Sequence, residues 1–138
     1  MSCVLRAYGK IFEVDKFLQN SKLKPIAIWR KGEAKWKNKP ERKCKDSGFS
    51  CDVSRKDFNN LKGQISDAVK FLKSNQSQLK KLVALSGVEN VGLDFGIERR
   101  DAYVQFDCFP SELLLLAGKL GIDVALTQYP ISKKRKSK

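Results

Sequence analysis

The sequence predicts an α+β fold, a two-layer sandwich in which an antiparallel or mixed sheet of about six strands carries its helices on one face. Three observations support this prediction. Several short segments alternate apolar and polar residues with period two, which is typical of strands with one buried face. One longer segment repeats apolar residues every three or four positions, as an amphipathic helix does. The breaks between segments indicate hairpins mixed with crossovers, which favours an antiparallel or mixed sheet over a purely parallel one.

The first half of the chain predicts three strands, one short helix and one loop. Cys3–Tyr8 alternates and predicts a strand, and Val14–Asn20 has the apolar spacing of a two-turn helix. A second strand is expected at Ile26–Arg30, after a proline that starts it. Lys31–Asp46 shows no periodicity and contains glycine and proline, so it predicts a loop. Gly48–Ser54 alternates again and predicts the third strand.

The middle of the chain predicts its longest helix. Ser54 with Asp57 three residues later resembles a capping box, and Gly87 is expected to end the helix after Ser86. A break near Ser74–Ser77 is possible, because Ser-Asn-Gln-Ser is a poor helix interior. The apolar positions with helical spacing are Phe58, Leu61, Ile65, Ala68, Leu72, Leu79 and Leu82.

The last third predicts two strands in a hairpin, a helix and a final strand. Val91–Ile97 and Tyr103–Cys108 both alternate, with a polar turn between them. Ser111 is expected to cap the following helix and Gly121 to end it, before a last strand that contains Ile122, Val124 and Leu126 and is ended by Pro130. The expected order of elements is therefore β-α-β-β-α-β-β-α-β, a style related to the ferredoxin-like split βαβ.

Length and composition indicate one globular domain without a membrane span. The chain has 138 residues, and we expect a single domain at 1–132 with a basic loop at 31–46 and a basic tail at 133–138. The longest apolar run, Leu113–Ala117, is far shorter than the ~20 residues that cross a bilayer. Because the first residues show no basic leader followed by an apolar stretch, we expect a cytoplasmic protein and no membrane partner.

The side chains present argue against most catalytic and metal sites. The sequence contains no histidine, which excludes Ser-His and Cys-His catalysis and the zinc sites that need histidine. Four cysteines occur without any CxxC pair. Two disulfides are possible, but Cys51 and Cys108 alternate with apolar residues, which favours buried free thiols. We therefore expect no cofactor, no metal and no enzymatic activity.

The polar face of the predicted sheet is a second candidate surface. Three of its aspartates could hold a cation or act as acid and base only if they converge. Solvation of one sheet face explains the same alternation, and no phosphate loop or nucleophile motif accompanies the aspartates. The residues expected on this face are Arg6, Tyr8, Trp29, Asp52, Asp94, Tyr103, Gln105 and Asp107.

The distribution of charge gives the strongest functional signal. The chain has a formal charge of +13, and the segment 22–45 alone carries +8, from ten basic and two acidic residues. The segment 133–138 adds +5, whereas 83–132 carries −4. Tryptophans lie among the lysines of the first segment, as at interfaces and stacking platforms, although Trp29 fits a core position equally well. The candidate partner-binding residues are Trp29, Arg30, Lys31, Lys35, Trp36, Lys37, Lys39, Arg42 and Lys43.

Short motifs along nearly the whole chain resemble a bacterial family catalogued as domain of unknown function 4279. They are Trp-Arg-Lys-Gly-Glu at 29–33, Ser-Gly-Phe at 47–49, a long helix, Ser-Glu-Leu-Leu at 111–114 and Tyr-Pro at 129–130. The chain departs from the family pattern in the lysine-rich loop, in Phe49 and in the basic tail. The resemblance implies a small cytoplasmic bacterial α+β domain without an assigned activity, and it brings no functional residues with it.

Two functional hypotheses follow from the charge and the size of the chain. The first is an immunity or inhibitor protein that neutralises a toxin domain, by analogy with other small bacterial domains, as a monomer or in a one-to-one complex with an acidic partner. The second is nucleic-acid binding, in which the loop and the tail contact phosphates and a tryptophan stacks on a base. No nucleic-acid-binding motif is recognised, which counts against the second hypothesis.

Overall fold

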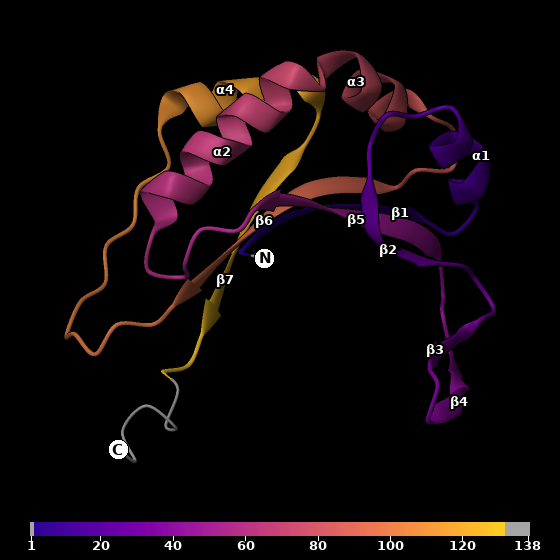
Figure 1. Ribbon diagram of the computed structural model, residues 1–138, viewed down its shortest axis with the longest axis horizontal. Helices are drawn as coiled ribbons and strands as arrows, with labels where there is room; N and C mark the ends of the chain where they lie inside the picture. Colours follow the sequence, from indigo (N-terminus) through magenta and orange to yellow (C-terminus); the bar gives the residue numbers. More distant parts are fainter. Residues whose placement is uncertain (1, 132–138) are drawn as a thin grey trace.

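The computed structural model describes residues 2–131 and confirms an α+β fold with the helices on one side of a mixed sheet (Figure 1). The main sheet has five strands in the order β2-β5-β1-β6-β7, and a separate pair is formed by β3 and β4. The elements are β1 (Cys3–Gly9), α1 (Val14–Gln19), β2 (Pro25–Trp29), β3 (Ala34–Trp36), β4 (Lys39–Lys43), β5 (Ser47–Ser54), α2 (Leu61–Ser74), α3 (Gln76–Ala84), β6 (Asn90–Glu98), α4 (Ser111–Leu120) and β7 (Asp123–Tyr129).

The core lies between the main sheet and the helices. In β1, Cys3, Leu5 and Ala7 are fully buried, and they alternate with side chains on the other face of the sheet. Strand β1 pairs antiparallel with both β5 and β6, so it is the centre of the sheet. The alternation of apolar and polar residues that predicted the strands therefore arises because one face of the sheet is buried against α2, α3 and α4. Among the described residues, no helix is long and apolar enough to cross a membrane.

The predicted hairpin of the last third is wrong. The segment 103–108 forms no strand, and β6 instead pairs with β7 in parallel. Strand β6 already has β1 on one side and β7 on the other, so it has no free edge for a hairpin partner. The connection from β6 to β7 is a crossover that contains α4, which is the way parallel strands are joined.

The predicted loop at 31–46 is also wrong in part, because it contains a two-stranded hairpin. Strands β3 and β4 pair around a two-residue turn, Lys37 and Asn38, with Trp36 opposite Lys39. Every residue from 31 to 43 is exposed. Because neither face of the hairpin is buried, the apolar periodicity that reveals the other strands is absent here.

The long predicted helix is two helices that meet at Asn75. The amide side chain of Asn75 donates to the carbonyl of Phe71 at 2.9 Å, which ends α2 within the predicted break region. The helix begins later than the capping-box pattern predicted, because the cap is Asn60, whose side chain accepts from the backbone N–H of Gly63 at 2.9 Å. The Ser54 hydroxyl instead donates to Asp67 at 2.7 Å.

The other helix ends also test the capping predictions. Pro110, not Ser111, occupies the cap position of α4, and no side chain caps this helix. Gly121 does end α4, in the left-handed conformation (φ 77°) that favours glycine. Gly87 follows the last residues of α3 with φ 97°, two residues after Leu85 caps that helix.

The four cysteines are free, and they differ in burial. Cys3 and Cys51 are buried, which confirms the expectation for Cys51, whereas Cys44 is half-buried. Cys108 is exposed, so its predicted burial is wrong; it lies in the segment that does not form a strand.

We expect a thiol reagent such as iodoacetamide to modify Cys108 fastest, Cys44 more slowly, and Cys3 and Cys51 only on unfolding. The thiolate is the reactive species, and burial raises the pKa of Cys51 to about 11 and that of Cys3 further. Peptide mapping by mass spectrometry over time measures the order. Rapid native-state labelling of either buried cysteine contradicts this arrangement.

Candidate functional site

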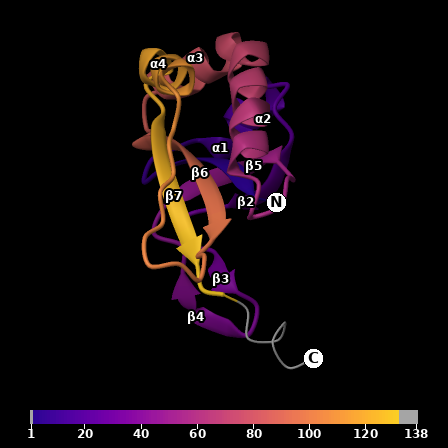
Figure 2. The ribbon, with the colours of Figure 1, turned by 90° about the vertical axis from the view of Figure 1, so that its left-hand side faces the viewer.

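The candidate site is the β3–β4 hairpin with the turns that lead into it, residues 31–45, which we call the cationic arm. It holds seven basic and two acidic residues, a net charge of +5. The arm extends away from the main sheet on the side opposite the helices (Figures 1 and 2). A two-stranded hairpin without a buried face gains little from packing, so its lysines and its tryptophan are not needed for the core.

The base of the arm is built by backbone hydrogen bonds. The N–H of Gly32 donates to the carbonyl of Cys44 at 3.0 Å, and the N–H of Cys44 donates to the carbonyl of Glu33 at 2.8 Å. Gly32 has φ 88°, a conformation that side chains disfavour and that turns the chain from β2 into the arm. The backbone N–H of Lys31 donates to the Ser47 hydroxyl at 2.9 Å.

Trp36 and the lysines around it form the centre of the arm. Trp36 is about half exposed, and the Lys35 ammonium lies 5.1 Å from the centroid of its ring. This distance is within the range of a cation–π interaction. An exposed indole among ammonium groups offers a flat apolar surface and positive charge at one place. The structure brings four predicted residues together here, Lys35, Trp36, Lys37 and Lys39.

Two predicted residues, Trp29 and Arg30, serve the fold of this region. The indole N–H of Trp29 donates to Asp46 at 2.9 Å, and its ring lies against Gly48, where a Cβ would come within 2.6 Å of it. Arg30 binds both carboxylate oxygens of Asp15, at 2.8 and 2.7 Å. These hydrogen bonds lower the pKa of Asp15 and raise that of Arg30. The sequence alone could not show that Trp29 and Arg30 are hydrogen-bonded within the fold, whereas the lysines of the arm are exposed.

The polar face of the sheet does not gather its aspartates. Asp94 accepts from Arg6 at 2.6 Å and from the Thr127 hydroxyl at 2.6 Å. Asp52 is bound by Arg55, and Asp107 by Arg100 at 3.1 Å. Each carboxylate thus has its own arginine, and no group of three or more metal-ligating side chains occurs within residues 2–131.

The other residues expected on the polar sheet face divide between the sheet and a loop. Arg6 and Tyr8 alternate with the buried side chains of β1, as predicted. Tyr103, Gln105 and Asp107 lie outside the sheet, because their segment is not a strand. The basic tail at 133–138 lies outside the described residues.

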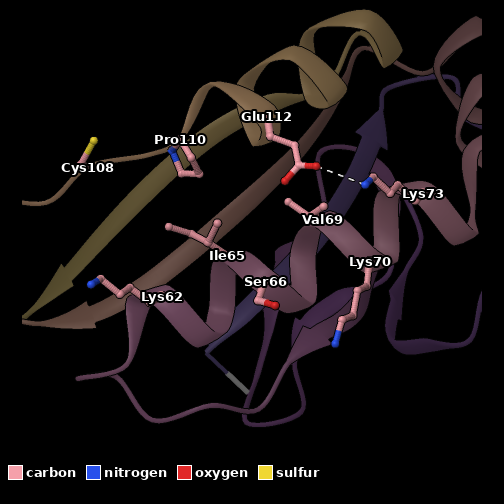
Figure 3. Close-up of a pocket in the computed structure, with 9 residues that line it drawn as sticks. All are labelled: Lys62, Ile65, Ser66, Val69, Lys70, Lys73, Cys108, Pro110 and Glu112. Atoms are coloured by element: carbon pink, nitrogen blue, oxygen red, sulfur yellow. Dashed lines mark hydrogen bonds and ion pairs between the residues drawn. The ribbon is translucent and has the colours of Figure 1, made fainter.

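A groove lies between α2 and the start of α4 (Figure 3). Ile65, Val69 and Pro110 line it, and Lys73 binds Glu112 across it at 3.1 Å. The amines of the other two lining lysines, Lys62 and Lys70, point away from one another in Figure 3. These charges do not converge on one point, so the groove does not form an anion site.

The comparisons with known proteins bear on the family alone. A family model described as a domain of unknown function, DUF4279, matches residues 1–130, which confirms the resemblance seen in the short motifs. No curated protein and no solved structure matches the chain. Two of the motifs meet in the sheet, because Trp29 of β2 is paired with Gly48 of β5 and its ring lies against this glycine.

Proposed function

The chain belongs to the DUF4279 family of unknown function, and we propose that it is a non-enzymatic binding protein that docks an acidic protein through its cationic arm. The observation that carries the proposal is the arm itself, a hairpin whose every residue from 31 to 43 is exposed. Opposite charge accelerates the encounter of two proteins, and a few aromatic or arginine anchors then supply most of the affinity. Trp36 is the anchor we assign on the arm.

The partner that we propose is a toxin-like protein with an acidic patch, held in a one-to-one complex in the cytoplasm. This part rests on analogy with small bacterial proteins that neutralise toxin domains. One property of the chain supports it, the net charge of +5 on the exposed arm. The arginine at the base of the arm, Arg30, is already paired with Asp15 and Glu33 and is not counted among the groups that attract the partner. The free charges of the arm are mainly lysines, which steer encounter over a distance.

Nucleic-acid binding is a second candidate, favoured by the shape of the arm. A two-stranded ribbon is one of the elements that the major groove of DNA admits, and an exposed indole can stack on an unpaired base. The segment 83–132 opposes this function, because it carries a net charge of −4, whereas the tail at 133–138 carries +5 and favours it. The acidic segment repels phosphates that extend beyond the arm.

The experiment is a charge reversal of the arm with a matched control. The arm variant replaces Lys35, Lys37, Lys39 and Lys43 by glutamate. The control replaces four exposed lysines of α2 and α3, Lys62, Lys70, Lys80 and Lys81, which gives the same change in net charge. We expect the arm variant to bind the product of the adjacent gene at least ~10-fold more weakly, and the control to bind within about threefold of the unmodified chain.

The same variants separate the two candidate functions. Retention on heparin and affinity for a DNA duplex, measured from low to moderate salt, fall steeply with salt if the arm contacts phosphates. Strong, salt-sensitive and arm-dependent DNA binding would establish the second candidate. Equal losses in the arm variant and the control would show that net charge, not the arm, attracts the partner, and would contradict the proposal.

A further inference from the structure

The connection between β6 and α4 exposes apolar side chains that the fold does not use. We call residues 101–108 the aromatic loop. Tyr103 is fully exposed, and Val104 and Phe106 are 74% and 81% exposed. Three large apolar side chains within four positions, all facing solvent, are a costly arrangement for a small protein and mark interaction sites in monomers.

The loop is held in this orientation by hydrogen bonds on its inner side. The Arg100 guanidinium donates to the Phe106 carbonyl at 3.2 Å and to Asp107 at 3.1 Å. The Arg100 backbone N–H donates to the Gln105 side chain at 3.0 Å, and that side chain donates to Asp107 at 3.1 Å. Gln105 and Asp107 are thus half-buried while Val104 and Phe106 face outward. In this alternating segment the polar side chains therefore face the protein and the apolar side chains face solvent, which is the reverse of a strand with one buried apolar face.

The aromatic loop and the cationic arm lie at opposite edges of the main sheet. The arm connects β2 to β5, the first two strands of the sheet order. The loop follows β6, which with β7 forms the opposite edge of the sheet. The arm points away from the helices, and the connection from β6 turns beyond the ends of β6 and β7 before it rises to α4 (Figures 1 and 2). A partner that meets both must therefore span the sheet from the arm to the ends of β6 and β7.

We infer that the aromatic loop is a second docking element for the partner of the cationic arm, and that it inserts Val104 and Phe106 into an apolar recess of an acidic protein. This inference rests on the proposed function. An apolar projection needs a recess on the other surface, and the lysines of the arm need carboxylates. The partner is thus a folded protein that carries an acidic patch and, apart from it, an apolar depression.

The local charge favours a protein over a membrane or a nucleic acid as the occupant. From Glu98 to Asp107 the chain carries two arginines and three acidic residues, and Arg100 is bound to Asp107. With a net charge of −1 this segment does not attract a negatively charged bilayer or a phosphate backbone, which would be attracted only at the arm. A protein recess lined with apolar side chains requires no positive charge at the loop.

The two elements contribute differently to the kinetics of binding. Exposed charges mainly set the association rate, whereas buried apolar anchors mainly set the dissociation rate. We therefore expect Val104→Ser with Phe106→Ser to raise the dissociation rate of the complex at least ~10-fold and to leave its association rate within about threefold. The arm variant should instead lower the association rate and flatten its dependence on salt.

The test uses surface plasmon resonance with the purified product of the adjacent gene as the probe. The control for the loop variant is Leu114→Ser with Leu115→Ser, two exposed leucines of α4, and it should dissociate like the unmodified chain. Matching circular dichroism spectra and urea midpoints establish that the variants are folded. Vesicles of phosphatidylcholine with and without phosphatidylglycerol test the bilayer as an occupant.

The outcomes separate the inference from the function on which it rests. If the arm variant binds weakly and the loop variant dissociates like the unmodified chain, the loop inference fails and the proposed function stands. If the unmodified chain does not bind the probe, or the arm variant binds as well as it does, the proposed function fails and the inference with it. Loop-dependent binding to the anionic vesicles would assign the loop to a bilayer and overturn the inference.

Discussion

Replacing Gly9 by alanine is expected to destabilise the protein by about 3 kcal/mol or more, the largest effect among the glycines. Gly9 is buried at the end of β1, directly beneath the turn that follows α3. A Cβ at this position would lie 1.8 Å from the carbonyl oxygen of Gly87 and 3.0 Å from the backbone nitrogen of Glu89. Both obstacles are backbone atoms, so no side-chain rotation can relieve the overlap.

The contact is also tied by hydrogen bonds that a shift of the turn would break. The backbone N–H of Glu89 donates to the carbonyl of Tyr8 at 2.9 Å, and the Glu89 carboxylate accepts from the N–H of Lys10. The turn itself requires Gly87 at φ 97°, where a Cβ would approach the carbonyl of Ile11 within 2.6 Å. The backbone at the end of β1 is therefore in direct contact with the backbone of the turn after α3, with no space for a side chain between them.

Urea unfolding followed by circular dichroism measures this effect, and Gly118→Ala is the matched control. Gly118 lies in α4 with nothing within 4 Å of its Cβ position, so alanine there should stabilise the protein by about 0.5–1 kcal/mol. The two changes add the same methyl group and are expected to have opposite signs. A Gly9→Ala variant as stable as the unmodified chain would show that the turn relaxes easily, contrary to this argument.

Apolar alternation predicted the strands that bury one face, and it failed where burial is absent or reversed. Strands β1, β5 and β6 were predicted within a residue of their ends because each presents one face to the helices. The hairpin of β3 and β4 buries neither face and so gave no signal. The segment 103–108 gave the opposite error, because its alternation is real but its apolar side chains face solvent.

The candidate site was predicted in location but not in detail. The net charge of 22–45 and its interleaved tryptophans placed the candidate residues between Trp29 and Lys43, since clustered lysines are visible without any structure. This pattern could not reveal that Trp29 binds Asp46 and that Arg30 binds Asp15, because both contacts join residues 15 or more positions apart. The exposure of Val104 and Phe106 was missed for a related reason: it depends on Arg100, whose hydrogen bonds turn Gln105 and Asp107 inward.

Gln64→Glu is expected to destabilise the protein by about 3–5 kcal/mol at neutral pH. Gln64 is fully buried in α2, and its side-chain amide donates to the carbonyl of Gly96 at 2.8 Å and to that of Asp57 at 3.2 Å. These bonds join the helix to β6. A glutamate of the same shape would bring a charged oxygen against these two carbonyl oxygens at a fully buried position.

The penalty should depend on pH in a direction that identifies its cause. The introduced carboxyl, when protonated, can still donate to one carbonyl, so folding favours its neutral form and raises its pKa above the unfolded value of about 4.3. The variant is therefore closest to the unmodified chain below the unfolded pKa. It loses about 1.4 kcal/mol per pH unit as the pH rises from there towards the folded pKa, and the loss then levels off.

Gln64→Met separates the charge from the lost hydrogen bonds. Methionine fills a similar volume and leaves the same two carbonyls without their donor, so it should cost about 1–3 kcal/mol at every pH. Urea unfolding of both variants and the unmodified chain from pH 4 to pH 8 gives the comparison. If the free energies of unfolding of the glutamate and methionine variants differ by the same amount at every pH, the prediction is wrong. That result would show that water reaches residue 64, contrary to the full burial of the Gln64 side chain between α2 and β6.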